Sequence, residues 1–106
     1  MFDALEMSLV VLERLAPVES RIRLKSRSLA SQLADASESI ALNLAEGRER
    51  KAGDRRRHWE MAAGSASEVT VALRIAVAKR YISPPEFAEI DAVLDRIRAM
   101  LYRLTK

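Results

Sequence analysis

The chain has 106 residues, of which 49% are hydrophobic and 31% charged, as is typical of one soluble globular domain covering residues 1–106. It has no cysteine, which excludes disulfides, thiol catalysis and cysteine-based zinc sites. Its formal charge of +3 is unevenly distributed, because residues 1–20 carry −3, residues 21–58 carry +5 and residues 59–106 carry +1. The positive potential is therefore concentrated in the middle of the chain.

The N-terminal residues 1–6 are acidic rather than basic, which argues against a signal peptide. No apolar run approaches the roughly 20 residues that a membrane-spanning helix needs. We therefore expect a cytoplasmic protein without a membrane partner.

The first predicted helix covers residues 3–16, and Pro17 is expected to end it. One apolar face follows the helical spacing of three and four residues and consists of Phe2, Leu5, Leu9, Leu12 and Ala16. Residues 17–27 are expected to form a basic connection in which Ser26 or Ser28 caps the next helix.

The second predicted helix covers residues 28–46, and Gly47 is expected to end it with a positive φ. Its apolar face consists of Leu29, Leu33, Ala36, Ile40 and Asn43. A second row, roughly 100° round the helix, consists of the small residues Ala30, Ala34, Ala41 and Ala45. Because small side chains let another helix approach closely, we expect this row to contact a second subunit.

The third predicted helix starts after a charged loop at residues 47–53, with Asp54 as its N-cap, and runs to residue 80. One stripe consists of Trp59, Ala62, Ala66, Val69, Leu73 and Ala76. Val71, Ile75 and Ala78 point to other sides, and a helix that is apolar nearly all round is normally buried all round. One small bundle cannot bury such a helix, so we expect Val71 and Ile75 to lie in an interface between subunits.

The fourth predicted helix has the clearest start signal, because Ser83, Pro84 and Glu86 fit the N-cap, the first helical position and a capping box. Its apolar stripe consists of Phe87, Ile90, Leu94, Ile97, Leu101 and Leu104. Four helices joined by short loops predict an all-α, antiparallel up-down-up-down four-helix bundle.

The segment Gln32-Leu33, Ala36, Ser39-Ile40 and Asn43-Leu44-Ala45-Glu46-Gly47 resembles the signature S-Q-L-x-x-A-x-x-S-I-x-x-N-I-A-E-G. This signature belongs to the four-helix bundle proteins encoded in intervening sequences of bacterial 23S ribosomal RNA genes. Residues 64–69 and 81–83 are similar to the family's G-S-L-A-E-L and G-Y-L-S segments. The third helix, however, starts with His58-Trp59 where the family has several phenylalanines, and the loop after Gly47 is charged rather than aromatic.

The resemblance implies a homo-oligomer, specifically a pentameric ring. A related branch of the family comprises the accessory variability proteins of diversity-generating retroelements, in which a basic pentamer partners a reverse transcriptase and nucleic acid. The resemblance therefore implies RNA or DNA, or a protein, as a partner.

No catalytic, metal or cofactor site is expected, so we do not expect an enzyme. His58 is the only histidine, and neither it nor Ser65 and Ser67 has a suitable partner residue nearby in the sequence. Asn43 is expected to be a buried amide bonded to a neighbouring helix, the alternative being a contact residue. Glu46 is expected to accept a hydrogen bond from Arg48 or a helix end, and Trp59 to pack in the core or an interface rather than stack on a base.

The candidate nucleic-acid site is the cluster of basic residues at the middle of the chain: Arg48, Arg50, Lys51, Arg55, Arg56 and Arg57. These side chains could neutralise phosphates, and an oligomer would repeat the patch and add avidity. The alternative is a solvated charged loop, partly neutralised by Glu49 and Asp54, or a contact between subunits. A second functional hypothesis is an interaction scaffold that docks another protein, for example a reverse-transcriptase-like partner, without binding nucleic acid.

Overall fold

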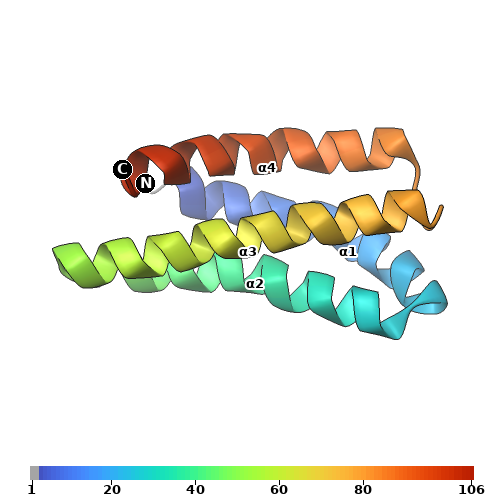
Figure 1. Cartoon of the computed structure of the whole chain (residues 1–106), viewed down its shortest axis with the longest axis horizontal. Helices are drawn as coiled ribbons and strands as arrows, with labels where there is room; N and C mark the ends of the chain where they lie inside the picture. Colours follow the sequence, from blue (N-terminus) through green and yellow to red (C-terminus); the bar gives the residue numbers. More distant parts are fainter. Residues whose placement is uncertain (1–2) are drawn as a thin grey trace.

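The computed structural model describes residues 3–106. It contains four helices: α1 (Asp3–Lys25), α2 (Arg27–Arg48), α3 (Ala52–Ala78) and α4 (Pro84–Leu104). Within this range no strand is present, so the prediction of a four-helix, all-α fold is confirmed. The chain reverses direction at each link (Figure 1). The two termini and the α2–α3 link therefore lie at one end, and the α1–α2 and α3–α4 links lie at the other.

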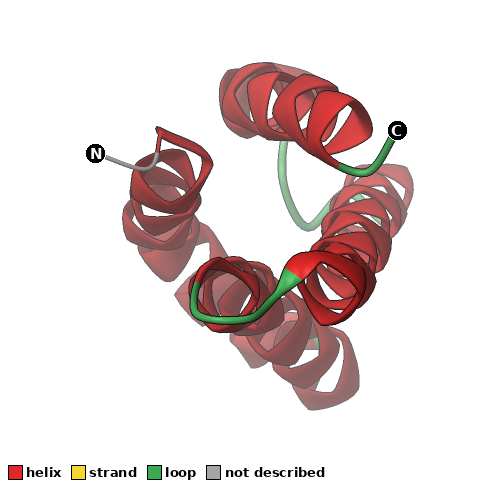
Figure 2. Cartoon of the chain, turned by 90° about the vertical axis from the view of Figure 1, so that its left-hand side faces the viewer, coloured by secondary structure: helices red, strands yellow, loops and turns green. Residues whose placement is uncertain are grey.

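The helices surround a single core, with each helix beside the next and α4 beside α1 (Figure 2). The most extensive contact is between α2 and α3. The bundle measures 42 × 22 × 20 Å. Its largest fully buried side chains include Ile22, Leu33, Ile40, Leu44, Leu73, Leu94, Ile97 and Leu101.

Helix α1 does not end at Pro17, so the predicted basic connection at residues 17–27 was wrong. The helix continues to Lys25 and is joined to α2 by Ser26 alone. Proline removes one intrahelical hydrogen bond, but Pro17 is exposed, and Val18 and Ile22 beyond it are buried in the core. Burial of this extra apolar surface outweighs the local preference of the proline to end the helix.

The buried face of α1 also differs from the predicted stripe. The buried residues are Ala4, Ser8, Val11, Leu15, Val18 and Ile22. Leu9 is 42% exposed and Ala16 is exposed, while Leu5 and Leu12 are half-buried; Phe2 lies outside the described residues. The predicted stripe and the buried row lie one residue apart along α1, and both follow the helical spacing of three and four residues. The row that continues past Pro17 to Val18 and Ile22 is the one that packs in the core.

Helix α2 starts as predicted, because the Ser26 side chain accepts a hydrogen bond from the Leu29 amide at 3.1 Å. The predicted role of Gly47 was wrong, since no glycine in the described range has a positive φ and α2 continues to Arg48. A β-carbon built on Gly47 would lie 2.5 Å from Trp59 Nε1. Glycine is needed here for the close approach of α3 rather than for its backbone conformation.

Helix α3 begins two residues before the predicted Asp54 cap. Lys51 is the N-cap and makes no side-chain capping bond, and Asp54 lies in the first turn, where a carboxylate favours the helix dipole. The predicted stripe from Ala62 to Ala76 is buried as expected, while Trp59 is half-buried.

Helix α3 is also, within residues 3–106, the one helix long and apolar enough to cross a membrane, with a mean hydropathy of 1.3 over the relevant window. The helix contains Glu68 and Arg74, so it is not the uninterrupted apolar run of about 20 residues whose absence the sequence indicates. The test rests on length and composition only, and core helices with a buried face pass it too, so it is weak evidence for a membrane span.

The turn between α3 and α4 combines two capping motifs. The Tyr81 amide donates to the Ala76 carbonyl at 2.8 Å and the Arg80 amide to the Val77 carbonyl at 2.9 Å, the pattern of a Schellman motif. Arg80 occupies the left-handed position of this motif with a φ of 62°. The predicted capping box of α4 is confirmed, since Ser83 and Glu86 bond reciprocally at 2.9 and 3.3 Å.

Candidate nucleic-acid interface

The six predicted phosphate-binding residues (Arg48, Arg50, Lys51, Arg55, Arg56 and Arg57) are brought together at the α2–α3 end of the bundle. We call them the 48–57 cluster. They lie on the last residue of α2, the link at residues 49–51 and the first turns of α3. All are exposed except Arg55, which is half-buried. Because the chain reverses direction between α2 and α3, the end of α2, the link and the start of α3 lie together at this tip (Figure 1).

Arg55 has a structural role in the cluster. Its Nε donates to the Gly47 carbonyl at 3.1 Å and its Nη2 to the Arg48 carbonyl at 3.1 Å, so it satisfies two carbonyls that the end of α2 leaves without intrahelical partners. Its guanidinium carbon lies 5.5 Å from the centre of the Trp59 ring, within cation–π range. Trp59 Nε1 in turn donates to the Leu44 carbonyl at 3.3 Å. Arg55, Trp59 and Gly47 thus clamp α3 onto the end of α2.

Acidic side chains hold four other members of the cluster. Arg50 Nε donates to Glu46 Oε1 at 2.9 Å, and Arg50 Nη1 lies 3.5 Å from Asp54 Oδ2. Glu46 therefore pairs with Arg50, not with Arg48 or a neighbouring helix end as expected. Arg57 contacts the second oxygen of Asp54 at 3.0 Å.

The remaining pairs are longer. Arg56 lies 3.7 Å from Glu60, and Arg48 lies 3.8 Å from Glu49. Residues 46–60 contain six basic and four acidic residues, which leaves a formal charge of +2.

These ion pairs keep the carboxylates ionised. The hydrogen bond from Arg50 lowers the pKa of Glu46, and the hydrogen bond from Arg57 lowers the pKa of Asp54. Glu46 raises the pKa of Arg50 in return. Exposed pairs of this kind are weak because water screens them, so phosphates can compete for the arginines. Lys51 has no carboxylate partner within the part of the chain that the structure describes.

A polar network lies between α2 and α3, next to the 48–57 cluster along the two helices. The sequence predicted only part of it. Asn43 Nδ2 donates to the carbonyl and the hydroxyl of Ser39, both at 3.0 Å, and its Oδ1 lies 3.1 Å from His58 Nδ1. Ser65 Oγ donates to Ser39 Oγ at 2.9 Å. The prediction that Asn43 bonds to a neighbouring helix is confirmed.

The same network orients the histidine ring. Since both Asn43 amide hydrogens are used by Ser39, the amide oxygen accepts and His58 Nδ1 donates. The buried Nε2 of His58 has no hydrogen-bond partner in residues 3–106. In the same range no group of three or more His, Cys, Asp and Glu residues is placed to hold a metal ion.

The predicted interface residues fall into two groups. Ala30 is fully buried and Ala41 is 9% exposed within the single chain, so their small side chains serve the close packing of α2 within its own bundle. Their assignment to a subunit interface stays a prediction. Ala34 and Ala45 are half-buried.

The α3 members of the predicted interface are open to solvent. Val71 is 56% exposed and Ile75 is 39% exposed. They line, with Gln32 and Ala72, a groove of about 290 Å³ between α2 and α3.

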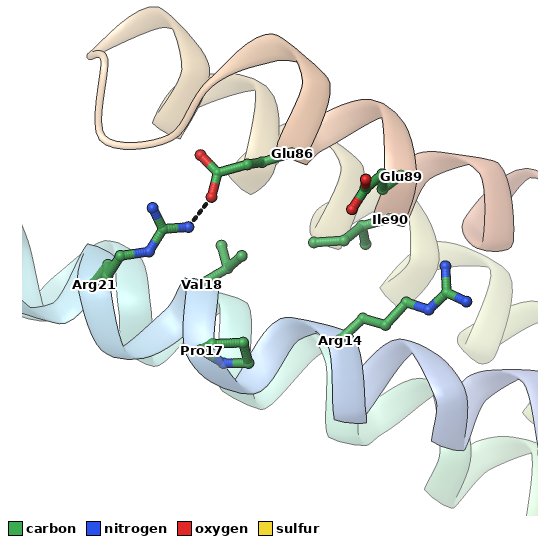
Figure 3. A pocket seen from close by; sticks show the side chains of 7 residues that line it. All are labelled: Arg14, Pro17, Val18, Arg21, Glu86, Glu89 and Ile90. Carbon is green, nitrogen blue, oxygen red and sulfur yellow. Dashed lines mark hydrogen bonds and ion pairs between the residues drawn. The ribbon is translucent and has the colours of Figure 1, made fainter.

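A larger groove of about 430 Å³ lies between α1 and α4 (Figure 3). Val18 and Ile90 form its apolar floor, and an ion pair between Arg21 and Glu86 crosses it. This pair, together with the Ser83 amide, lowers the pKa of Glu86 to about 2. The groove thus ties α1 to the first turn of α4, and its lining places no nucleophile beside a base.

The fold and the charged tip define a small all-α bundle with a basic end. The chain belongs to the family of 23S rRNA-intervening sequence proteins, whose family model matches residues 4–103. It is similar to the crystal structure of a protein of unknown function from the S23 ribosomal protein family of Bacteroides thetaiotaomicron. The two share 18% sequence identity with a TM-score of 0.89, and the match covers 97% of this chain and 98% of the other. No curated protein matches the chain.

Proposed function

We propose that this protein is a non-enzymatic, cytoplasmic homo-oligomer that binds RNA or DNA through the 48–57 cluster. The observation that carries the proposal is that six basic residues, five of them exposed, lie on the end of α2, the link and the start of α3, at one tip of the bundle. Phosphates neutralised by such side chains release counterions, which drives association without any need for base contacts. The cluster has no aromatic side chain interleaved with its exposed cations, so we expect little sequence preference.

Oligomerisation is supported by the outer face of α3. Met61, Val71 and Ile75 lie within one side of this helix by its 3.6-residue period and are 47%, 56% and 39% exposed. Glu68 lies between Met61 and Val71 on this side, but exposed apolar side chains grouped on one face of a helix are typical of an interface. We propose that a second copy covers it and, from the family resemblance, that five copies close a ring. Each added copy would repeat the basic tip and raise the avidity for a long polyanion.

The binding test uses fluorescence anisotropy with labelled DNA and RNA duplexes of about 20 base pairs, titrated between about 50 and 200 mM salt. Arg55 stays unchanged because it clamps α2 to α3. The test variant is Lys51→Ala/Arg56→Ala/Arg57→Ala, which removes three exposed cations of the cluster. If five cluster residues contact phosphates, the parent's log K falls with log salt at a slope of about −4 to −5, and the variant's slope is shallower by about 3.

A matched control removes three exposed cations outside the 48–57 cluster: Arg14→Ala/Arg74→Ala/Arg96→Ala. It carries the same change in net charge, so it separates local contacts from the overall field. Equal binding by the cluster variant and the control variant would remove the cluster from the proposal. No binding by the parent at low salt would overturn nucleic-acid binding altogether.

The second candidate is an interaction scaffold, and the same α3 face favours it if another protein rather than a second copy covers Val71 and Ile75. A monomeric parent that captures one stoichiometric protein partner, resistant to nuclease and lost on Val71→Glu, would support the scaffold over the homo-oligomer.

A further inference from the structure

The end of the bundle opposite to the 48–57 cluster carries a second group of basic residues that are far apart in the sequence. Lys25 ends α1, Arg27 begins α2, and Lys79 and Arg80 follow α3. We call these four residues the opposite-end cluster. All four are exposed, and the two links that carry them lie at the same end of the bundle (Figure 1).

This end is more positive than the tip that the sequence singled out. Residues 19–27 and 79–86 contain six basic and two acidic residues, a formal charge of +4. The two acids are occupied by other arginines, since Glu19 pairs with Arg23 and Glu86 pairs with Arg21. Within residues 3–106, the four side chains of the opposite-end cluster therefore have no carboxylate partner.

Fold stability does not account for two of these cations. Lys25 and Lys79 lie at helix C-terminal ends, where a positive charge favours the helix dipole. Arg27, in contrast, is the first residue of α2, where a cation opposes the dipole, and no acid lies in that first turn to offset it.

Arg80 adopts a backbone conformation that is unfavourable for any residue other than glycine. It is held at a φ of 62°, the left-handed conformation that costs an L-residue energy and usually belongs to glycine. Its backbone there is fixed by the two hydrogen bonds of the Schellman motif. A strained arginine in an exposed turn points to a role for its side chain outside the fold.

The surroundings of Arg80 suit a nucleic acid. A groove of about 570 Å³ lies beside it and is lined also by Tyr81, Ile82 and Pro84. Tyr81, which is half-buried, lines this groove next to the Arg80 cation. The bundle is 22 × 20 Å in section, and a duplex carries one phosphate charge per about 1.7 Å of its axis. A duplex that crosses this end of the bundle therefore brings several phosphates close to the cluster.

We infer that the opposite-end cluster is a second nucleic-acid-binding surface, with Arg80 at its centre, so that the bundle contacts phosphates at both ends. The inference extends the proposed function but names different residues, and the two can therefore fail separately. A bundle that is basic at both ends can hold two segments of nucleic acid on opposite sides.

The test repeats the anisotropy titration with two variants of this end. Lys25→Ala/Arg27→Ala/Lys79→Ala makes the salt slope shallower by about 2–3, and Arg80→Gly alone makes it shallower by about 1. Arg80→Gly relieves the left-handed strain, so it also raises the melting temperature. Weaker binding by a more stable protein separates a lost contact from a lost fold.

The outcomes of this test decide between the two surfaces when the variants are compared with the control Arg14→Ala/Arg74→Ala/Arg96→Ala, whose cations belong to neither cluster. Loss of affinity in the opposite-end variants alone supports this inference and overturns the assignment of the 48–57 cluster. Loss in the Lys51→Ala/Arg56→Ala/Arg57→Ala variant alone overturns this inference and leaves the proposed function standing. Loss in both supports both.

Two further results count against the inference. A parent that binds no nucleic acid at about 50 mM salt refutes both surfaces together. An opposite-end cluster that binds anionic vesicles or polyglutamate as tightly as duplexes refutes a nucleic-acid surface at this end.

Discussion

Replacing Gly47 by alanine probes the place where α2 and α3 approach most closely. A β-carbon at this position would lie 2.5 Å from Trp59 Nε1, 2.6 Å from Trp59 Cδ1 and 3.2 Å from the Arg55 carbonyl oxygen. The indole is fixed by its bond to the Leu44 carbonyl and by the Arg55 guanidinium, and the carbonyl belongs to the backbone of α3. The added methyl group therefore forces the ring, α3 or both to move.

The expected effect is a net loss of stability. Overpacking costs about 1–3 kcal/mol, and a displaced Trp59 ring that loses its hydrogen bond costs about 0.5–1.5 kcal/mol. The gain in helix propensity from glycine to alanine offsets about 0.8–1 kcal/mol of this. Gly47→Ala should therefore lower the free energy of unfolding by roughly 1–3 kcal/mol.

Gly64→Ala is the matched control, because Gly64 lies inside α3 and its β-carbon would meet nothing within 4 Å of its own chain; since Gly64 is on the side of α3 proposed as an interface, both variants are compared in the same oligomeric state. This change should raise the free energy of unfolding by about 0.5–1 kcal/mol. Urea unfolding followed by circular dichroism, at one fixed protein concentration, measures both variants. If Gly47→Ala stabilises the protein as much as Gly64→Ala does, the reasoning about the α2–α3 contact is refuted.

Three further predictions concern other parts of the bundle. Arg80→Gly should stabilise the fold by up to about 1 kcal/mol in the same urea assay, because glycine adopts a φ of 62° without strain; a loss of stability would contradict this. Glu86→Gln should cost about 0.2–1 kcal/mol at neutral pH through loss of the charged pair with Arg21, while the glutamine oxygen can still accept the Ser83 amide of the capping box. Because the pKa of Glu86 in the folded protein, about 2, lies below its ordinary value of 4.5, the contribution of this carboxylate is full above pH 4.5 and is lost as the pH falls through about 2. The difference between parent and Glu86→Gln should shrink over that window in unfolding experiments, and a difference independent of pH would contradict the assignment. Leu94→Ala should cost about 2–5 kcal/mol by thermal or urea unfolding, since Leu94 is fully buried, and a cost below 1 kcal/mol would place it outside the core.

The sequence predicted the number and order of the helices well because strong periodic patterns and caps decide these features locally. The capping box at Ser83 and Glu86 is read from four consecutive residues, and the structure contains it unchanged. Pro17 shows the limit of such reasoning. Its local preference to end a helix was outweighed by the burial of Val18 and Ile22 against other helices, a term that no local pattern contains.

The candidate site was predictable where it is contiguous in the sequence and was missed where it is not. The 48–57 cluster could be seen as a run of basic residues, but the clamp that removes Arg55 from it depends on carbonyls of α2. The opposite-end cluster joins Arg27 to Arg80 across more than fifty residues, so only the reversal of the chain at each link brings them to one end. The helical pattern and the bundle together could have predicted this, had charge been mapped onto the two ends.

The mass of the parent protein in solution, measured by light scattering, tests most directly the claim that copies of this chain cover the exposed face of α3. The account predicts a particle of about five times the 11.9 kDa chain, which Val71→Glu dissociates because it buries an unpaired charge in the interface. A parent that remains at 11.9 kDa at micromolar concentration would contradict the account.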